Sequence, residues 1–127
     1  MKYLWTTISV ENMEESIRFY TTLVGLKLLR RFPAGAGIEL AFLGNGVDGE
    51  TTIELMADSS IGTIGFNEFI SIGFAVASID EMLSIVQREK IPVYSGPVET
   101  PGSFFFTVQD PDGLQVQFFQ QKAQVAK

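Results

Sequence analysis

The sequence predicts an α+β fold with two tandem βαβββ modules. They are expected to form a curved mixed sheet with the helices outside and a concave cleft inside. Three observations predict it: short apolar–polar alternations recur along the 127 residues, two helix-capping motifs each follow an alternating segment, and the two halves repeat at a nearly constant offset in residue number. The modules are expected at about residues 1–57 and 69–121, with a polar connector at 58–68.

The first module opens with a strand, because apolar and polar residues alternate from Leu4 to Val10. Asn12, with Glu15 three residues later, then predicts a helix N-terminus, and Gly25 is well placed to end that helix. Three further strands are expected at 26–32, 38–43 and 51–56.

The second module repeats this order. Alternation over 70–76 predicts a strand, the capping box from Ser78 to Glu81 opens a helix, and Pro92 blocks its continuation. Three further strands are expected at 93–94, 104–108 and 114–119, and the last two are joined by a tight turn at Asp110–Gly113.

An offset of 66 residues relates the two modules. It maps Val10 onto Val76, Asn12 onto Ser78, and the strand at 38–43 onto 104–109, and it then falls to 63 where Glu54 maps onto Gln117. Each module carries one helix, which can cover only one face of its sheet, so the other face is expected to line the cleft.

Strand alternation divides the side chains between the two faces. The helix-facing core is predicted to contain Leu4, Ile8, Val10, Ile53, Leu55, Ile70, Ile72, Phe74, Val116 and Phe118. The cleft is predicted to be lined by Trp5, Thr7, Ser9, Thr52, Glu54, Met56, Ser71, Gly73, Gln115, Gln117 and Phe119.

The composition excludes several kinds of chemistry. The chain contains no His and no Cys, so imidazole–metal sites, Ser–His triads, thiol nucleophiles and disulfides are excluded. The net charge of −6 argues against a nucleic-acid partner. No apolar run is long enough for a membrane span and no targeting segment is visible, so we expect a cytoplasmic protein with no membrane partner.

Several short motifs, in this order and spacing, resemble the vicinal oxygen chelate superfamily, which includes glyoxalase I, bleomycin resistance proteins and extradiol dioxygenases. The motifs are Phe19-Tyr20 with Gly25-Leu26, Ile53-Glu54-Leu55, Gly96-Pro97 and Asp110-Pro-Asp-Gly113. The resemblance covers roughly residues 2–121 and is closest to small bacterial glyoxalase I-like proteins. It implies the glyoxalase/bleomycin resistance fold, and a homodimer, since small members pair to complete their clefts.

In metal-using members of this superfamily, four ligands come from positions that fall here on Trp5, Glu54, Ser71 and Gln117. The family usually has His, Glu, His and Glu at these places, and this sequence keeps only Glu54. An indole N–H cannot coordinate a cation, and Ser and Gln are weak neutral ligands. We therefore expect no metal and no other cofactor.

Two residues carry the functional hypothesis. Trp5, the only tryptophan, either stacks on a planar or apolar ligand or fills the emptied site as ordinary core. Glu54 either accepts a hydrogen bond or a charge from a ligand, acts as a general base, or is a surviving family residue satisfied by Gln117, Ser71 or water.

The leading interpretation is a metal-free binding protein for a small apolar or aromatic ligand, which can also be cationic, and which contacts Trp5, Thr7, Glu54, Ser71, Gln117 and Phe119. The first alternative is an isomerase or lyase in which Glu54 is the catalytic base. The second alternative is an interaction domain with a vestigial cleft.

Overall fold

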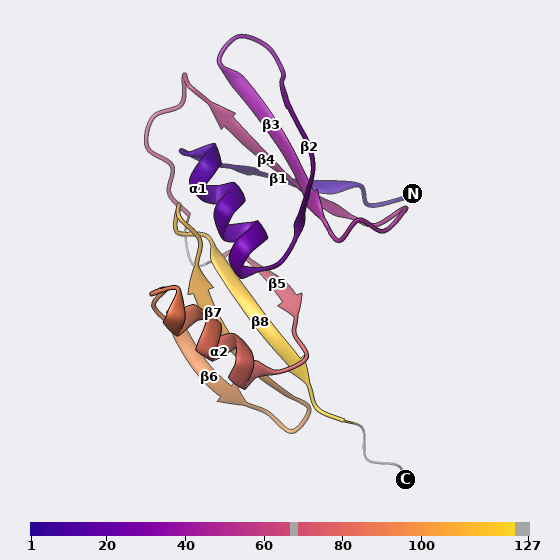
Figure 1. Ribbon diagram of the computed structural model, residues 1–127, viewed down its shortest axis with the longest axis vertical. Coiled ribbons are helices and arrows are strands. Elements are labelled where there is room, and N and C mark those ends of the chain that lie inside the picture. Colours follow the sequence, from indigo (N-terminus) through magenta and orange to yellow (C-terminus); the bar gives the residue numbers. More distant parts are fainter. Residues whose placement is uncertain (67–68, 124–127) are drawn as a thin grey trace. The chain divides into compact units, whose positions relative to one another are not determined.

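The chain folds as two compact units, Met1–Gly65 and Phe66–Lys127 (Figure 1). The computed structural model describes residues 1–66 and 69–123, so residues 67–68 of the expected connector lie outside the described part. Each unit has one helix and one four-stranded mixed sheet. The predicted α+β fold with two βαβββ modules is confirmed.

In the first unit, the helical segment between the first two strands is an α-helix that continues into a π-helical turn. The elements are β1 (Trp5–Ser9), α1 (Met13–Arg18), η1 (Phe19–Leu23), β2 (Lys27–Pro33), β3 (Ile38–Gly44) and β4 (Thr52–Asp58). The sheet has the order β1-β4-β3-β2, with β1 parallel to β4 and the other pairs antiparallel. Helix α1 packs against β4.

The second unit has the same topology. Its elements are β5 (Ser71–Ala75), α2 (Ile79–Arg88), β6 (Ser95–Glu99), β7 (Ser103–Gln109) and β8 (Gln115–Gln121). The sheet order is β5-β8-β7-β6, with β5 parallel to β8, and α2 packs against β8 and β7. Among the described residues, none of the helices has the length and apolar character that a membrane crossing requires.

Both predicted helix caps are formed. The Asn12 side chain accepts a hydrogen bond from the Glu15 amide at 3.0 Å, and the Ser78 hydroxyl accepts one from the Glu81 amide at 3.2 Å. After η1, Gly25 adopts a positive φ of 87°, which turns the chain into β2. Helix α2 ends at Arg88, before Pro92 is reached, with Lys90 at φ 59°.

The core lies between each helix and its sheet, and the strand alternation identifies most of it. Ile8, Leu55, Val116 and Phe118 are at most 4% exposed, and Val10 is also buried. Ile53, Ile72 and Phe74 are half-buried.

Two predicted core residues are exposed, Leu4 at 53% and Ile70 at 49%. They are equivalent in the repeat, and each lies one residue before its strand begins, at Trp5 and Ser71. The prediction was wrong for both, because each side chain lies at the end of its sheet, one residue before the first paired residue of its strand.

The strand predicted at 93–94 is displaced. Val93 and Tyr94 are exposed and precede β6, which covers Ser95–Glu99, although the Tyr94 amide already donates to the Thr107 carbonyl at 2.7 Å. The β-branched and aromatic residues suggested a strand, but regular pairing with β7 involves Ser95, Val98 and Glu99.

The repeat offset also changes at an additional place. Phe42 pairs with Glu54, and Thr107 pairs with Gln117, so Phe42 corresponds to Thr107 at an offset of 65, not 66. The predicted mapping of 38–43 onto 104–109 was wrong by one residue, which would exchange the two faces of the strand. We attribute the additional residue in the first module to η1, because a π-helical turn holds one residue more than an α-helical turn.

Candidate functional site

One row of side chains crosses the first sheet on the face opposite its helix. The strand register places Thr7 on β1 opposite Glu54 on β4, Glu54 opposite Phe42 on β3, and Phe42 opposite Arg30 on β2. Paired residues on neighbouring strands project from the same face, so these four side chains lie side by side. We call this set the Glu54 row.

Glu54 is the central acid of this row, and it is only 9% exposed. The Thr7 hydroxyl donates a hydrogen bond of 2.6 Å to Glu54 Oε1. A buried carboxylate needs such a partner, because removing its charge from water is costly. The sequence suggested Gln117, Ser71 or water for this role; the partner is Thr7 on the neighbouring strand.

The second carboxylate oxygen of Glu54 has no hydrogen-bond partner among the described residues. Within that same part of the chain, no fully buried side-chain oxygen or nitrogen lacks a partner. Oε2 therefore reaches the surface of the sheet, where it can accept a hydrogen bond from a bound molecule.

Trp5 lies next to the Glu54 row on the same face. It pairs with Thr52, which precedes Glu54 by two residues on β4, and its side chain is 45% exposed. The indole meets the Phe42 ring edge to face, with 5.4 Å between ring centroids. Because β4 separates β1 from β3, this ring contact passes over β4 beside Glu54. Trp5 thus helps to shield the carboxylate and still offers open aromatic surface.

The candidate residues of the second unit also share one face of their sheet. Ser71 pairs with Gln115, Gly73 with Gln117, and Ala75 with Phe119. Gln117 is half-buried, and its side-chain oxygen lies beside Gly73, whose missing side chain leaves room for it. Phe119 is 38% exposed and stacks on Phe105 at 6.5 Å, whereas Phe118 points to the helix side and is buried.

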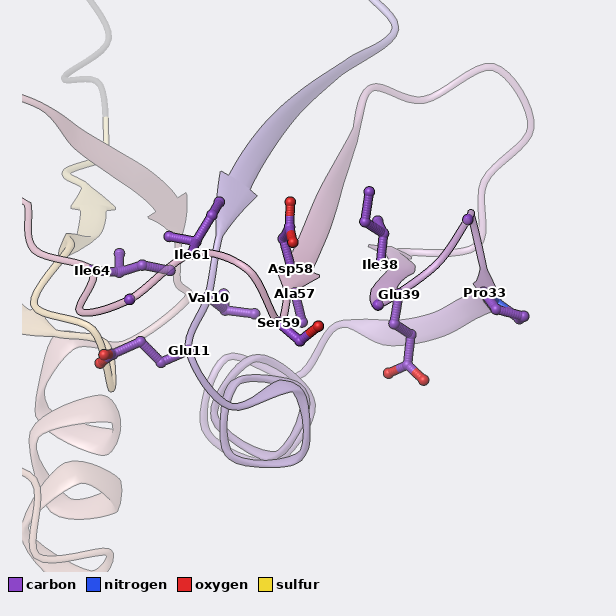
Figure 2. A pocket seen from close by; sticks show the side chains of 13 residues that line it. Val10, Glu11, Pro33, Ile38, Glu39, Ala57, Asp58, Ser59, Ile61 and Ile64 are labelled. Carbon is purple, nitrogen blue, oxygen red and sulfur yellow. The ribbon is translucent and has the colours of Figure 1, made fainter.

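A separate hollow of about 680 Å³ lies at one end of the first sheet (Figure 2). Its apolar lining includes Val10 and Ile61, and its acidic residues are Glu11, Glu39 and Asp58. The three carboxylates point in different directions in Figure 2. Glu39 is also paired with Arg31 at 2.9 Å, and hydrogen bonds from the Ser60 hydroxyl and amide hold the pKa of Asp58 below its usual value. The hollow therefore has no convergent set of ligand groups.

Sequence reasoning missed two members of the Glu54 row, Phe42 and Arg30. Alternation within a single strand places Phe42 on the same side as Leu40, but it does not show which strand lies beside which. The neighbours of Glu54 follow from the order β1-β4-β3-β2 and its register.

The comparisons with known proteins identify the family. The profile of the Glyoxalase/Bleomycin resistance protein/Dioxygenase superfamily matches residues 2–118. The chain belongs to this superfamily. Among curated relatives, it is 30% identical to a lactoylglutathione lyase of Neisseria meningitidis serogroup A, over 97% of this chain and 93% of the relative.

Solved structures with a similar fold agree with this assignment. The fold is similar to that of the trypanothione-dependent glyoxalase I of Leishmania major, with a TM-score of 0.81, 27% identity, and coverage of 94% of this chain and 86% of the other. It also resembles an antibiotic binding protein from Streptomyces, with a TM-score of 0.73, 21% identity, and coverage of 96% and 97%. At that identity, the second likeness concerns the fold alone.

The residues that the resemblance assigns to metal-ligand positions do not have the chemistry that a transition metal requires. Trp5 offers only an N–H donor, and Glu54 already accepts a hydrogen bond from Thr7 through one oxygen. Ser71 is exposed and neutral, and Gln117 is neutral. Within the described ranges 1–66 and 69–123, no group of three or more Asp or Glu side chains is arranged to hold a metal ion.

The Thr7–Glu54 hydrogen bond should contribute measurably to stability. Thr7→Val removes the donor and leaves Glu54 Oε1 without a protein partner, so the free energy of unfolding should fall by about 1–3 kcal/mol. The loss should be smaller in a Glu54→Gln background, because the hydrogen bond is then no longer charge-assisted. Urea unfolding followed by circular dichroism measures both.

The matched control is Thr52→Val, the same change on the same face of the sheet, at a side chain with no hydrogen bond in the described structure. It should leave the unfolding midpoint nearly unchanged. Equal losses for Thr7→Val and Thr52→Val would contradict the assigned role of the hydrogen bond.

Proposed function

We propose that this protein is a metal-free binding protein for a small molecule with an apolar or aromatic body. The ligand is held on the face of the first sheet that carries Trp5, Thr7 and Glu54. The observation that carries the proposal is the state of Glu54: the side chain is nine-tenths buried, yet only one of its oxygens is hydrogen-bonded to another described residue. A buried acceptor with an open oxygen beside exposed aromatic surface is suited to a ligand with a hydrogen-bond donor or a positive charge.

The second unit carries the other candidate ligand contacts on the equivalent face of its own sheet. Ser71, Gln117 and Phe119 project from the side opposite α2, as Trp5 and Glu54 do from the side opposite α1. Their hydroxyl, amide and aromatic groups offer neutral hydrogen bonds and apolar surface to a ligand.

A second candidate function is a metal-independent isomerase or lyase in which Glu54 removes a proton from a carbon acid. One observation favours it: relatives at 30% identity are lactoylglutathione lyases, and the chain keeps a carboxylate at Glu54. Turnover that is lost on Glu54→Gln while ligand affinity is retained would support catalysis over binding alone.

A ligand found by a thermal-shift screen of aromatic, cationic and dicarbonyl-derived compounds should change the fluorescence of Trp5, the only tryptophan in the chain. Glu54→Gln should weaken its binding about ten- to a hundredfold, because a charge-assisted hydrogen bond to the ligand is lost. The control is Glu99→Gln, an exposed acid on β6 in the second unit. Wild-type affinity in both Trp5→Phe and Glu54→Gln would indicate a vestigial site with binding elsewhere.

The purified protein should contain no stoichiometric transition metal, because the four ligand positions offer a single carboxylate and no imidazole or thiolate. Elemental analysis of tag-free protein should give well below one equivalent each of Ni, Zn, Fe, Mn and Co. One equivalent of any of these metals that disappears in Glu54→Ala would overturn this part of the proposal.

We also propose that the protein is a homodimer. The edge strands carry exposed apolar side chains, among them Leu28 and Leu29 on β2 and Val98 on β6, and such edges are usually covered by pairing or docking. Light scattering at micromolar concentration should give twice the chain mass of 14.0 kDa. A mass equal to one chain would count against the dimer.

A further inference from the structure

We propose that Arg30 is a second binding residue on the face that carries Glu54, and that it recognises an oxyanion, either a carboxylate or a phosphate, on the same ligand. The inference rests on the proposed ligand site and extends it. The ligand is then dipolar: it carries a hydrogen-bond donor or positive charge for Glu54 and, at its other end, an anion for Arg30.

The first step of the argument is the position of Arg30. It belongs to the Glu54 row, opposite Phe42, which in turn lies opposite Glu54. Neighbouring strands are about 4.8 Å apart, so the backbone positions of Arg30 and Glu54 are separated by roughly 10 Å. A molecule the size of a substituted aromatic ring can span that distance.

The second step is the way the guanidinium is held. The central carbon of the Arg30 guanidinium lies 4.6 Å from the centroid of the Phe42 ring and 5.5 Å from that of Phe32. These two rings are themselves nearly parallel, with 6.2 Å between centroids. Aromatic contacts attract the cation and restrict its motion, but they do not use its five N–H donors.

The third step is the contrast with Arg31, the next residue along β2. Arg31 makes ion pairs with Glu14 at 2.5 Å and with Glu39 at 2.9 Å, and these pairs raise the pKa of Arg31 further. Arg30 has no ion pair and no hydrogen bond with any described residue. In a chain with six more acidic than basic charges, an arginine held on aromatic rings without a carboxylate partner has its donors available for a ligand.

The Arg30 guanidinium and the Glu54 carboxylate can bind opposite ends of one ligand. A guanidinium presents a planar fork of donors that matches a carboxylate or a phosphate, and the open oxygen of Glu54 accepts from a donor. Trp5 is 45% exposed and supplies aromatic surface for the body of the ligand, whereas Phe42, which lies between the two charges, is buried and supports Trp5 and Arg30 from below. This face therefore selects a molecule with opposite polarity at its two ends.

The test uses the whole 127-residue chain and four probes that share one aromatic body: para-toluate, para-tolyl phosphate, para-methylbenzylamine, and the zwitterion para-(aminomethyl)benzoate. Affinities are measured by Trp5 fluorescence titration and checked by NMR chemical shifts. The zwitterion should bind about tenfold more tightly than para-methylbenzylamine, because it engages both charged side chains. The affinity of the anions should fall as the salt concentration rises from about 50 to about 300 mM.

Arg30→Gln should lower the affinity for the zwitterion and for at least one anion about tenfold or more. The affinity for para-methylbenzylamine should stay within about twofold of the wild-type value. The anion whose affinity falls more shows whether Arg30 prefers a carboxylate or a phosphate. Arg31→Gln is the matched control, because it removes the same charge from the neighbouring residue, whose guanidinium is paired with Glu14 and Glu39. The affinity for every probe should stay within about twofold of the wild-type value. Thermal unfolding verifies that both variants are folded.

The outcomes separate the two proposals. If para-methylbenzylamine binds in a Glu54-dependent way but the anions are insensitive to Arg30→Gln, the role of Arg30 is overturned and the proposed ligand site stands. If the anions depend on Arg30 but no probe depends on Glu54, the role of Arg30 stands and the proposed role of Glu54 fails. If no probe binds at millimolar concentration, both are overturned.

Discussion

A four-stranded sheet with a single helix on it has one face that the helix cannot reach, and the rest of the structure depends on that constraint. In each unit the helix connects the first strand to the second and covers the side of the sheet that carries the core, including Ile8 and Leu55 in the first unit and Val116 and Phe118 in the second. The opposite face does not pack against the helix, so its side chains need not form a continuous apolar surface. Polar and charged side chains can therefore be placed at the centre of the sheet without disturbing the core.

The first unit uses this freedom to hold a carboxylate in an unusual environment. Glu54 lies on an interior strand, with Thr7 donating to it from one neighbouring strand and Phe42 pairing with it from the other. Trp5 adds a second aromatic wall. A single hydrogen bond from a β-strand residue fixes one oxygen, while the aromatic neighbours reduce access of water and leave the other oxygen open. Phe42 also holds the Arg30 guanidinium, so residues from all four strands set the positions of the charged groups on this face.

The fold could be predicted from the sequence because its signals are local. Capping residues such as Asn12 and Ser78, the alternation in each strand, and the Asp110–Gly113 turn each depend on only a few neighbouring residues, and the Asp110 carboxylate does accept hydrogen bonds from the Asp112 and Leu114 amides. The same alternation also predicted that Trp5, Thr7 and Glu54 share one face of the sheet. What could not be predicted depends on register between strands that are distant in sequence. Thr7 as the partner of Glu54, and Arg30 as a member of the same row, require the order β1-β4-β3-β2 and the alignment of each pair. The exposure of Leu4 and Ile70 likewise depends on where each strand begins and not on hydrophobicity.

The π-helical turn at Phe19–Leu23 shows where this architecture tolerates a change in length. A single additional residue inside a regularly paired strand would turn every following side chain to the opposite face of the sheet. Polar side chains such as Glu54 would then point into the core. The same residue inside a helical turn bulges outward and leaves the strands in phase, as the equivalent positions of Phe42 and Thr107 demonstrate. The two modules of this chain thus differ in length at the helix and in the hairpin before the last strand, while the central strands β4 and β8 keep the same pairing with their neighbours. Protein engineers who wish to lengthen this chain should insert residues at those same places.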